Sequence, residues 1–179
     1  MKKFLIVMAI IIAVIALSVF AVFSVQNKAI SYEGQISIAE SEINVQEKRR
    51  ADLIPNLVDC VKQYDMHEYQ TLMAVVNARG TTSDEAVEEI QTMIAAVAEA
   101  YPELKSSENY RELMNELAAT ENLIANVRTN YNTWANKYNI YVQQFPNRQI
   151  LSILGYEAKT YQNLEYEASA DAPTNLFDE

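Results

Sequence analysis

The hydrophobic positions divide the chain into one continuous apolar segment and a longer region of helical periodicity. Residues 4–25 are apolar except for Ser18 and Ser24. A helix of this length rises about 33 Å, which is enough to cross a hydrocarbon core of about 30 Å. A secretory signal has a shorter apolar stretch of about 7–15 residues, so we expect an uncleaved transmembrane anchor at residues 4–25.

Over residues 28–64, apolar residues recur every seven positions. The members of this pattern are Ile36, Ile43, Leu57 and Tyr64, and Arg50 fills the one gap. Such spacing is typical of a helix that buries one side. Pro55 lacks the N–H that a helix needs and disfavours helical backbone at the preceding residue. We therefore expect the helix to kink or restart there, with Asp52 as the N-cap of the restarted part.

Turn signals then predict two shorter helices. We expect a turn around residues 65–67, an interruption at 79–81, and a new helix from the capping-box pair Thr82 and Glu85. Pro102 marks the following turn. The predicted apolar stripes of these helices contain Leu72, Met73, Val76, Val87, Ile90, Ile94, Val97 and Tyr101.

The longest periodic stretch comes last. Its seven-residue pattern comprises Tyr110, Leu117, Ile124, Tyr131, Tyr138 and Phe145. This pattern predicts a helix of about 55–60 Å that packs at shallow angles against partner helices. It should end at Phe145-Pro146, before a short helix over residues 150–154 that Gly155 terminates. Residues 167–179 are polar and acidic, and we expect them to be disordered.

Three blocks of the sequence resemble the LemA family. They are VQEKRRADLIPNLVDCVKQYDMHEYQTL, AYPELKSSENYRELMNELAATENLIANVRTNYN, and the pairs Tyr138-Asn139 and Phe145-Pro146. The likeness covers residues 28–165 and includes the anchor, although Gln63 stands where the family usually has glycine. The resemblance implies an all-α chain: an N-terminal transmembrane helix followed by an elongated antiparallel four-helix bundle. It supplies no reaction.

The expected domain organisation follows from these patterns. A flank at residues 1–3 precedes the anchor at 4–25, the bundle covers 26–166, and the acidic tail covers 167–179. Lys2 and Lys3 lie on the short side of the anchor, so the positive-inside rule favours a cytoplasmic N-terminus and an extracytoplasmic bundle.

Charge and composition exclude several kinds of function. The net charge is −10, and no basic patch of the size that nucleic-acid binding needs is present. His67 is the only histidine, and Thr71 stands where a zinc-protease helix or a similar metal site would need a second one. Cys60 has no base within reach on the same helix, and we interpret it as a small core residue. We predict no catalytic residue, no metal site and no cofactor.

The remaining polar residues form a candidate interaction or structural cluster. We expect Asp52 and Arg79 to form an ion pair between helices, although both could equally be solvated. Glu47 and Asp52 flank the basic run at residues 48–50, which favours a solvated or internally paired cluster over a phosphate site. As a functional patch, this run would suit an acidic partner protein. The full candidate set is Lys48, Arg49, Arg50, Asp52, Asn56, His67, Glu68, Arg79, Arg128 and Asn132.

These observations favour a membrane-anchored scaffold or adaptor of the bacterial cell envelope that acts through protein contacts. The alternatives are a self-assembling homo-oligomeric coat that organises membrane and, less favoured, a metal-dependent hydrolase. The expected partners are the lipid bilayer, through residues 4–25, and other membrane proteins or copies of the chain. No nucleic acid and no small-molecule substrate is expected.

Overall fold

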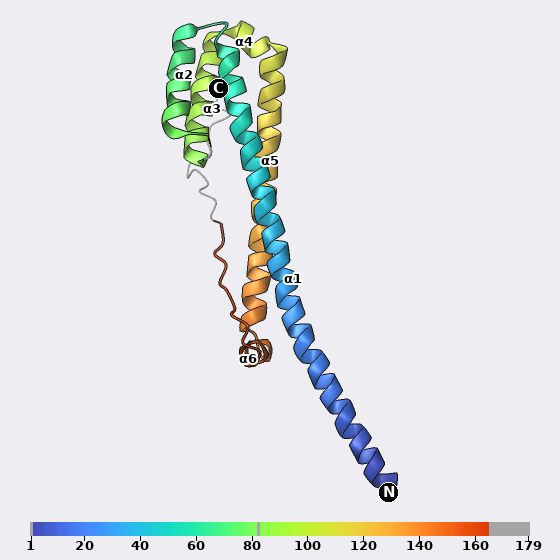
Figure 1. Ribbon diagram of the computed structural model, residues 1–179. Coiled ribbons are helices and arrows are strands. Elements are labelled where there is room, and N and C mark those ends of the chain that lie inside the picture. Colours follow the sequence, from blue (N-terminus) through green and yellow to red (C-terminus); the bar gives the residue numbers. More distant parts are fainter. Residues whose placement is uncertain (1, 82, 165–179) are drawn as a thin grey trace, which may run out of the picture. The chain divides into compact units, whose positions relative to one another are not determined.

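The computed structural model describes residues 2–81 and 83–164, and every regular element in these ranges is a helix (Figure 1). The all-α prediction is therefore confirmed for this part of the chain. The tail predicted for residues 167–179 lies outside it. The helices are α1 (Lys2–Val61), α2 (Met66–Arg79), α3 (Asp84–Ala100), α4 (Pro102–Ser106), α5 (Glu108–Gln143) and α6 (Asn147–Ile153).

The chain folds into two compact units, which we name by their place in the sequence. The terminal unit is formed by Met1–Ile36 and Tyr131–Glu179, and the middle unit by Ser37–Asn130. Helices α1 and α5 contribute residues to both units, while α2, α3 and α4 belong to the middle unit and α6 to the terminal unit.

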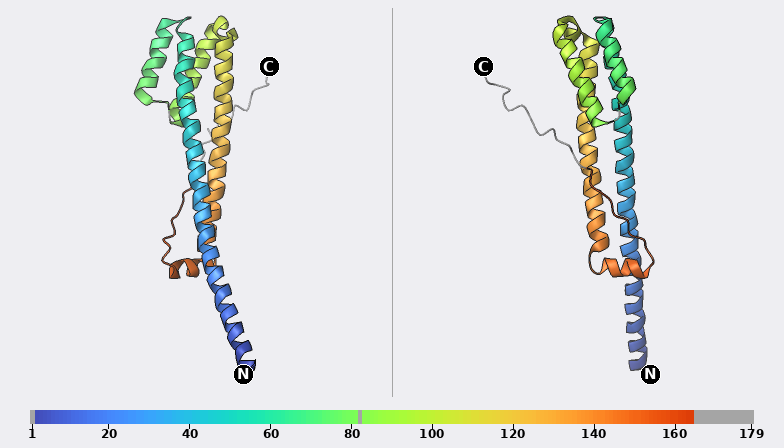
Figure 2. Two further views of the ribbon diagram at one scale, coloured as in Figure 1. Left: turned by 45° about the vertical axis from the view of Figure 1, so that its right-hand side comes forward. Right: turned by 90° about the vertical axis from the view of Figure 1, so that its left-hand side faces the viewer.

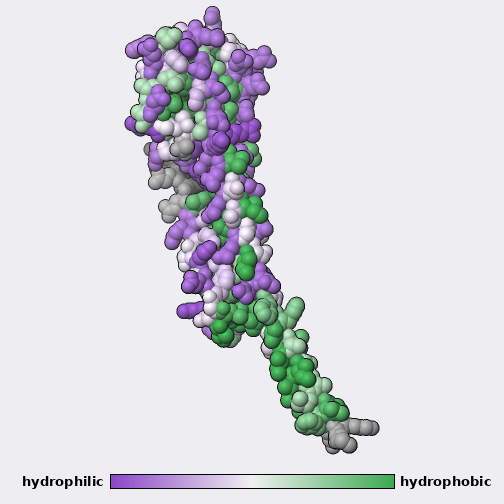
Figure 3. All heavy atoms as spheres, viewed as in Figure 1, coloured by the Kyte–Doolittle hydropathy of each residue, from purple (hydrophilic) through white to green (hydrophobic). Residues whose placement is uncertain are grey.

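The first part of α1 is long and apolar enough to cross a membrane, and none of its most apolar window is buried. Its largest side chains face outward: Phe4, Leu17 and Phe20 are 69%, 68% and 75% exposed. Figure 3 shows a continuous hydrophobic surface along this stretch. A helix of this composition is normally buried in the core of a soluble protein, and this one is not buried.

Helix α1 continues without interruption through Pro55 to Val61, so the predicted restart and the N-cap role of Asp52 are wrong. Ile54 and Leu57, on either side of the proline, are fully buried. Burying a side chain of this size stabilises a fold by about 1.5–3 kcal/mol, which offsets the one helical hydrogen bond that proline removes.

The carbonyl that Pro55 leaves without its usual helical donor belongs to Ala51. The Thr81 hydroxyl, from the segment between α2 and α3, donates a hydrogen bond of 3.5 Å to this carbonyl. In the next position, the Asn56 side chain donates to the Asp52 carbonyl at 3.0 Å. A tertiary contact therefore replaces part of the local hydrogen bonding that proline disrupts.

The core of the middle unit draws on all five of its helical segments. Figures 1 and 2 show α2 and α3 side by side in each view. Buried members of this core include Leu57 and Val58 of α1, Leu72 of α2, Ile90 and Ile94 of α3, Leu104 of α4, and Leu117 of α5. Most of them belong to the apolar patterns recognised in the sequence, which identified the buried faces of α1, α3 and α5.

Capping residues set the helix boundaries in this unit. Asp65 is the N-cap of α2, and its carboxylate accepts hydrogen bonds from the backbone N–H groups of His67 and Glu68. Gly80 ends α2 with a φ of 76°, a conformation that glycine adopts without the steric cost of a side chain. Ser83 is the N-cap of α3, so this helix begins one residue later than the Thr82 pattern predicts.

The terminal unit has a smaller and more aromatic core. Its buried residues are Ala29, Ile36, Tyr131, Ala135, Tyr138, Val142 and Leu151. The seven-residue pattern of α5 is buried through Tyr138, but Phe145 is 83% exposed because α5 ends at Gln143. The short helix predicted at residues 150–154 is confirmed as α6, which begins three residues earlier, at Asn147.

Candidate functional site

Five charged side chains of the middle unit form an ionic cluster around Asp84, the first residue of α3. The Asp84 carboxylate accepts hydrogen bonds from Arg50 of α1 at 2.7 Å and from Arg128 of α5 at 2.6 Å. Arg128 also donates to Glu47 at 2.9 Å, and Arg50 lies 3.4 Å from Glu121. We call these five residues the Asp84 cluster. It joins three helices through charge.

The register of α1 explains why Arg50 lies at the centre of this cluster. Arg50 occupies the gap in the seven-residue pattern, so its side chain points into the same face as Ile43 and Leu57, and it is 1% exposed. A buried charge is costly unless it is paired and hydrogen-bonded. Asp84, at the positive end of the α3 dipole, supplies that pairing.

Hydrogen bonds within the cluster shift the pKa values of two members, Asp84 and Arg128. The guanidinium of Arg128, and secondly that of Arg50, hold the pKa of Asp84 below its usual value. The same hydrogen bond to Asp84 is the main cause that raises the pKa of Arg128. A general acid or base works best with a pKa near the operating pH, and these shifts move both groups away from it. The cluster is therefore suited to joining helices and not to proton transfer.

The predicted ion pair between Asp52 and Arg79 is wrong. Within the described ranges, Arg79 pairs with Glu89 of α3 at 2.5 Å, and the exposed Asp52 accepts a hydrogen bond from the Asn56 side chain through its backbone carbonyl. The carboxylate that binds arginine across the helices is Asp84. The prediction considered only the two helices that carry Asp52 and Arg79, and it did not include α3, which supplies both Asp84 and Glu89.

The basic run at residues 48–50 does not act as one surface patch. Lys48 is exposed, whereas Arg49 forms a surface ion pair with Glu116 at 2.7 Å. Arg50 points into the core. Successive helical residues differ by about 100° in direction, so three adjacent side chains meet three different environments.

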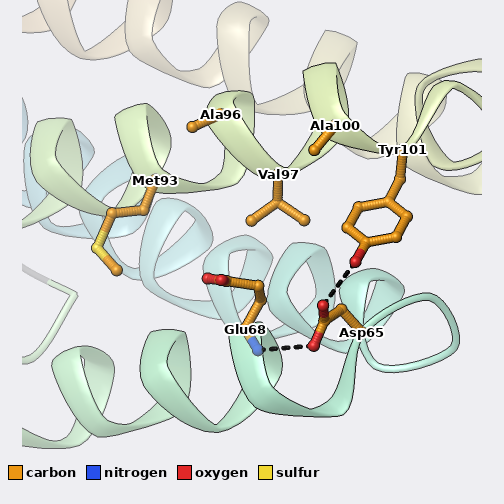
Figure 4. Close-up of a pocket in the computed structure, with 7 residues that line it drawn as sticks. All are labelled: Asp65, Glu68, Met93, Ala96, Val97, Ala100 and Tyr101. Atoms are coloured by element: carbon orange, nitrogen blue, oxygen red, sulfur yellow. Dashed lines mark hydrogen bonds between the residues drawn. The ribbon is translucent and has the colours of Figure 1, made fainter.

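Two other predicted residues, His67 and Asn56, lie exposed on the middle unit. Glu68 instead lines a pocket of about 320 Å³ between α2 and α3, drawn in Figure 4. In this pocket the Tyr101 hydroxyl donates a hydrogen bond of 2.6 Å to the Asp65 carboxylate. The other lining residues are Met93, Ala96, Val97 and Ala100.

The pocket carries little chemistry. The hydrogen bond from Tyr101, followed by those from backbone N–H groups of α2, lowers the pKa of Asp65, and the same bond raises the pKa of Tyr101. Both groups therefore keep their ordinary neutral-pH states, and Asp65 is occupied as the N-cap of α2. The sequence analysis did not identify Asp65 as an N-cap, although Asp65 and Glu68 have the spacing of a capping box. That spacing does not indicate the hydrogen bond with Tyr101. Across residues 2–81 and 83–164, no group of three potential metal ligands is found.

Asn132, the last predicted residue, belongs to a second polar arrangement in the terminal unit. Its side chain donates to the Leu164 carbonyl at 2.9 Å and accepts from the Leu164 N–H at 2.7 Å. Asn139 does the same for Tyr161, at 2.7 and 3.1 Å. Each amide thus pairs with the backbone of the segment that follows α6. The sequence signal is the seven-residue spacing of the two asparagines on α5.

A buried tyrosine completes this arrangement. The Tyr138 hydroxyl accepts a hydrogen bond from the Lys159 N–H at 3.2 Å, and it lies 3.2 Å from the Tyr156 hydroxyl and 3.4 Å from Glu33. Burial, followed by the contact with Tyr138, raises the pKa of Tyr156. The phenol of Tyr156 is therefore neutral at neutral pH. The arrangement holds one chain segment against α5.

Comparison with known proteins supports the resemblance found in the sequence. A model described as the LemA family matches residues 39–177. The protein LemA of Metamycoplasma hominis is 26% identical over 155 residues, which cover 79% of this chain and 71% of that protein. Magnetosome protein MamQ 2 of Paramagnetospirillum magneticum is 31% identical over 80 residues, covering 45% of this chain but only 29% of its own length. The family match extends over most of the sequence, and the chain belongs to the LemA family.

Proposed function

We propose that this protein is a membrane-anchored helical scaffold or adaptor of the bacterial cell envelope, and that it acts through protein contacts and not through catalysis. The observation that carries the proposal is the continuity of α1. One helix contains both the exposed apolar stretch from Phe4 to Val25 and the buried residues Ile54 and Leu57 of the middle-unit core. A bundle attached to its anchor in this way is held at a membrane surface, where it can bind other proteins.

The polar groups of the middle unit support a non-catalytic role. The buried Arg50 and the half-buried Arg128 are paired with carboxylates that come from other helices. Such cross-links favour a rigid antiparallel four-helix bundle, which we propose for the segments of α1, α2, α3 and α5. Lys2 and Lys3 before the anchor favour a cytoplasmic N-terminus with the bundle on the other side of the membrane.

A self-assembling coat that organises membrane is the second candidate. Ile38 and Val45 lie seven residues apart on α1, and they are 53% and 60% exposed. Two apolar side chains on one helix face are typical of a contact between helices. The names of the MamQ relatives place those proteins with the magnetosome, which is consistent with a role in organising membrane.

The mass of the full-length protein in mild detergent distinguishes these functions. We would measure it by light scattering after size-exclusion chromatography, alongside the double variant Ile38→Arg/Val45→Arg. A mass of one or two copies supports the adaptor, and crosslinking in cells would then identify its partner. A mass of many copies that the double variant reduces supports the coat. Recovery of the wild-type protein in the soluble fraction after cell lysis would contradict both proposals.

A further inference from the structure

The corner between α5 and α6 exposes an apolar surface that the described residues do not cover. Phe145 and Ile153 are 83% and 84% exposed, the highest values among the large hydrophobic side chains that the structure describes. Leu151 of the same short helix is buried, so α6 packs one side onto the terminal unit and presents Ile153 on the other. Figure 3 shows this hydrophobic surface next to the apolar stretch of α1.

Hydrogen bonding places this corner at the end of the apolar stretch. The Tyr141 hydroxyl donates to the carbonyl of Val25, the last residue of that stretch, at 3.3 Å. Lys28 lies over the rings of Tyr32 and Tyr141, at 5.9 and 5.4 Å from their centroids. Tyrosine and lysine side chains at this position are typical of the boundary between acyl chains and headgroups.

The orientation and charge of the corner fit a lipid surface. Helix α6 lies across the direction of α1 and not along it (Figure 2), so it lies roughly in the membrane plane if α1 crosses the membrane. Arg148 is exposed on α6, and Lys28 lies close to the same boundary. Residues 26–36 and 131–164 together contain four basic residues and two acidic ones, whereas the chain as a whole is acidic. Basic residues beside apolar ones are the combination that binds anionic lipids.

We propose that the α5–α6 corner is a second membrane contact, in which Phe145 and Ile153 insert at the headgroup–acyl boundary of the bilayer that α1 crosses. The contact rests on the anchoring proposed above. It makes the terminal unit a two-point attachment: α1 spans the bilayer, and α6 lies on it and restricts how the unit tilts and turns about α1.

Tryptophan fluorescence in lipid tests this contact on the full chain. Trp134 is the only tryptophan, so Trp134→Phe gives a dark background into which Phe145→Trp is introduced. The protein is reconstituted into vesicles of phosphatidylethanolamine and phosphatidylglycerol, with or without bromine at carbons 6 and 7 of the acyl chains. An indole within about 5–10 Å of the headgroup boundary should lose about half of its emission in the brominated vesicles. Ile153→Trp serves as a second probe of the same surface.

Two control positions separate the possible outcomes. Phe20→Trp reports on the anchor itself, and Leu123→Trp, which replaces a 42% exposed side chain of α5, lies about 27 Å along that helix from Tyr141. The inference is overturned if Phe20→Trp is quenched and both corner probes are not, and the anchor then still stands. It is also overturned if Leu123→Trp is quenched as strongly as the corner probes. Corner probes with blue-shifted but unquenched emission would identify a second copy as the cover, which contradicts the proposal. If Phe20→Trp is also unquenched, the anchoring itself fails.

Discussion

The two units of this protein stabilise their polar groups by different means. The middle unit places full charges at its core, where Arg50 and Arg128 meet the Asp84 carboxylate. In the terminal unit, the side chains of Asn132, Asn139 and Tyr138 bind backbone N–H and carbonyl groups of the segment after α6, and the ion pair of that segment, Lys159 with Glu33, is long at 3.8 Å.

The difference follows from what each unit has to join. In the middle unit, the backbone N–H and C=O groups of α1, α3 and α5 are already hydrogen-bonded within each helix. Charged side chains can therefore link one helix to another. In the terminal unit, an extended segment follows α6, and its N–H and C=O groups have no helical partners. Backbone groups of that kind form hydrogen bonds with side chains or with water. Primary amides serve this purpose because each has one donor group and one acceptor.

The largest expected effect comes from removing the buried charge of the middle unit. Arg50→Ala should lower the free energy of unfolding by about 3 kcal/mol, because it leaves a void and separates α1 from Asp84 and Glu121. The neighbouring variant Arg49→Ala removes a half-exposed pair with Glu116 and should cost less than about 1 kcal/mol. Chemical unfolding followed by circular dichroism in mild detergent measures both. Equal effects of the two variants would show that the Asp84 cluster adds no more than a surface ion pair.

The next effect is confined to the terminal unit. The double variant Asn132→Ala/Asn139→Ala removes four side-chain hydrogen bonds to the segment after α6, and each of these solvent-accessible bonds contributes about 0.5 kcal/mol. We expect the backbone N–H groups of Tyr161 and Leu164 to lose their protection against hydrogen exchange. Protection in α3 should not change, because α3 belongs to the other unit. Unchanged exchange at Tyr161 and Leu164 would mean that the asparagines do not hold the segment.

A smaller, pH-dependent effect should appear in the middle unit alone. The folded pKa of Asp84 is lowered, so its ionised form stabilises the fold at neutral pH, and this contribution disappears as the pH falls through the lowered pKa, below about 4. Asp84→Asn should therefore lower the melting temperature at pH 7, and the gap to the wild type should narrow as the pH is brought to 3. A gap of constant size would exclude the carboxylate charge as its cause.

The smallest effect concerns the proline in α1. Thr81→Val removes the hydroxyl that donates to the Ala51 carbonyl at 3.5 Å, a long hydrogen bond whose loss should cost about 0.5 kcal/mol or less. Pairing this change with Pro55→Ala in a double-mutant cycle sharpens the measurement, because alanine restores the helical donor to Ala51. The two changes should then be non-additive. Additive effects would show that Thr81 does not compensate for the proline.

Periodicity predicted the helices and most of the buried faces, since apolar spacing reports directly on which side of a helix is covered. Ile36, Ile43 and Leu57 are buried as their spacing indicates. Local rules were less reliable. Pro55 indicated a restart in α1, but burial of the side chains around it keeps the helix continuous. Phe145 continued the pattern of α5 by spacing, yet it lies beyond the end of that helix.

The polar contacts were predicted less well than the helices. Arg50 and Arg128 were both recognised as candidates, but Asp84, which joins them, was not. Its importance depends on where the first turn of α3 lies relative to α1 and α5, which the sequence does not state. For the same reason Arg79 was assigned to Asp52 instead of Glu89. The gap at Arg50 was the one sequence signal for the cluster, because a charge on an apolar face has to meet an opposite charge.

The two asparagines of α5 also fix the register between this helix and the segment after α6. Seven helical residues advance about 10.5 Å, and three residues of extended chain advance about 10 Å, so Asn132 and Asn139 coincide with Leu164 and Tyr161. Each amide binds only backbone atoms of the segment after α6, so the side chains of that segment do not affect these contacts. Substitutions at Gln162 and Asn163 should therefore be tolerated. A deletion of one residue between the two contacts would shift the register, so that Asn132 and Asn139 could not both bind the segment.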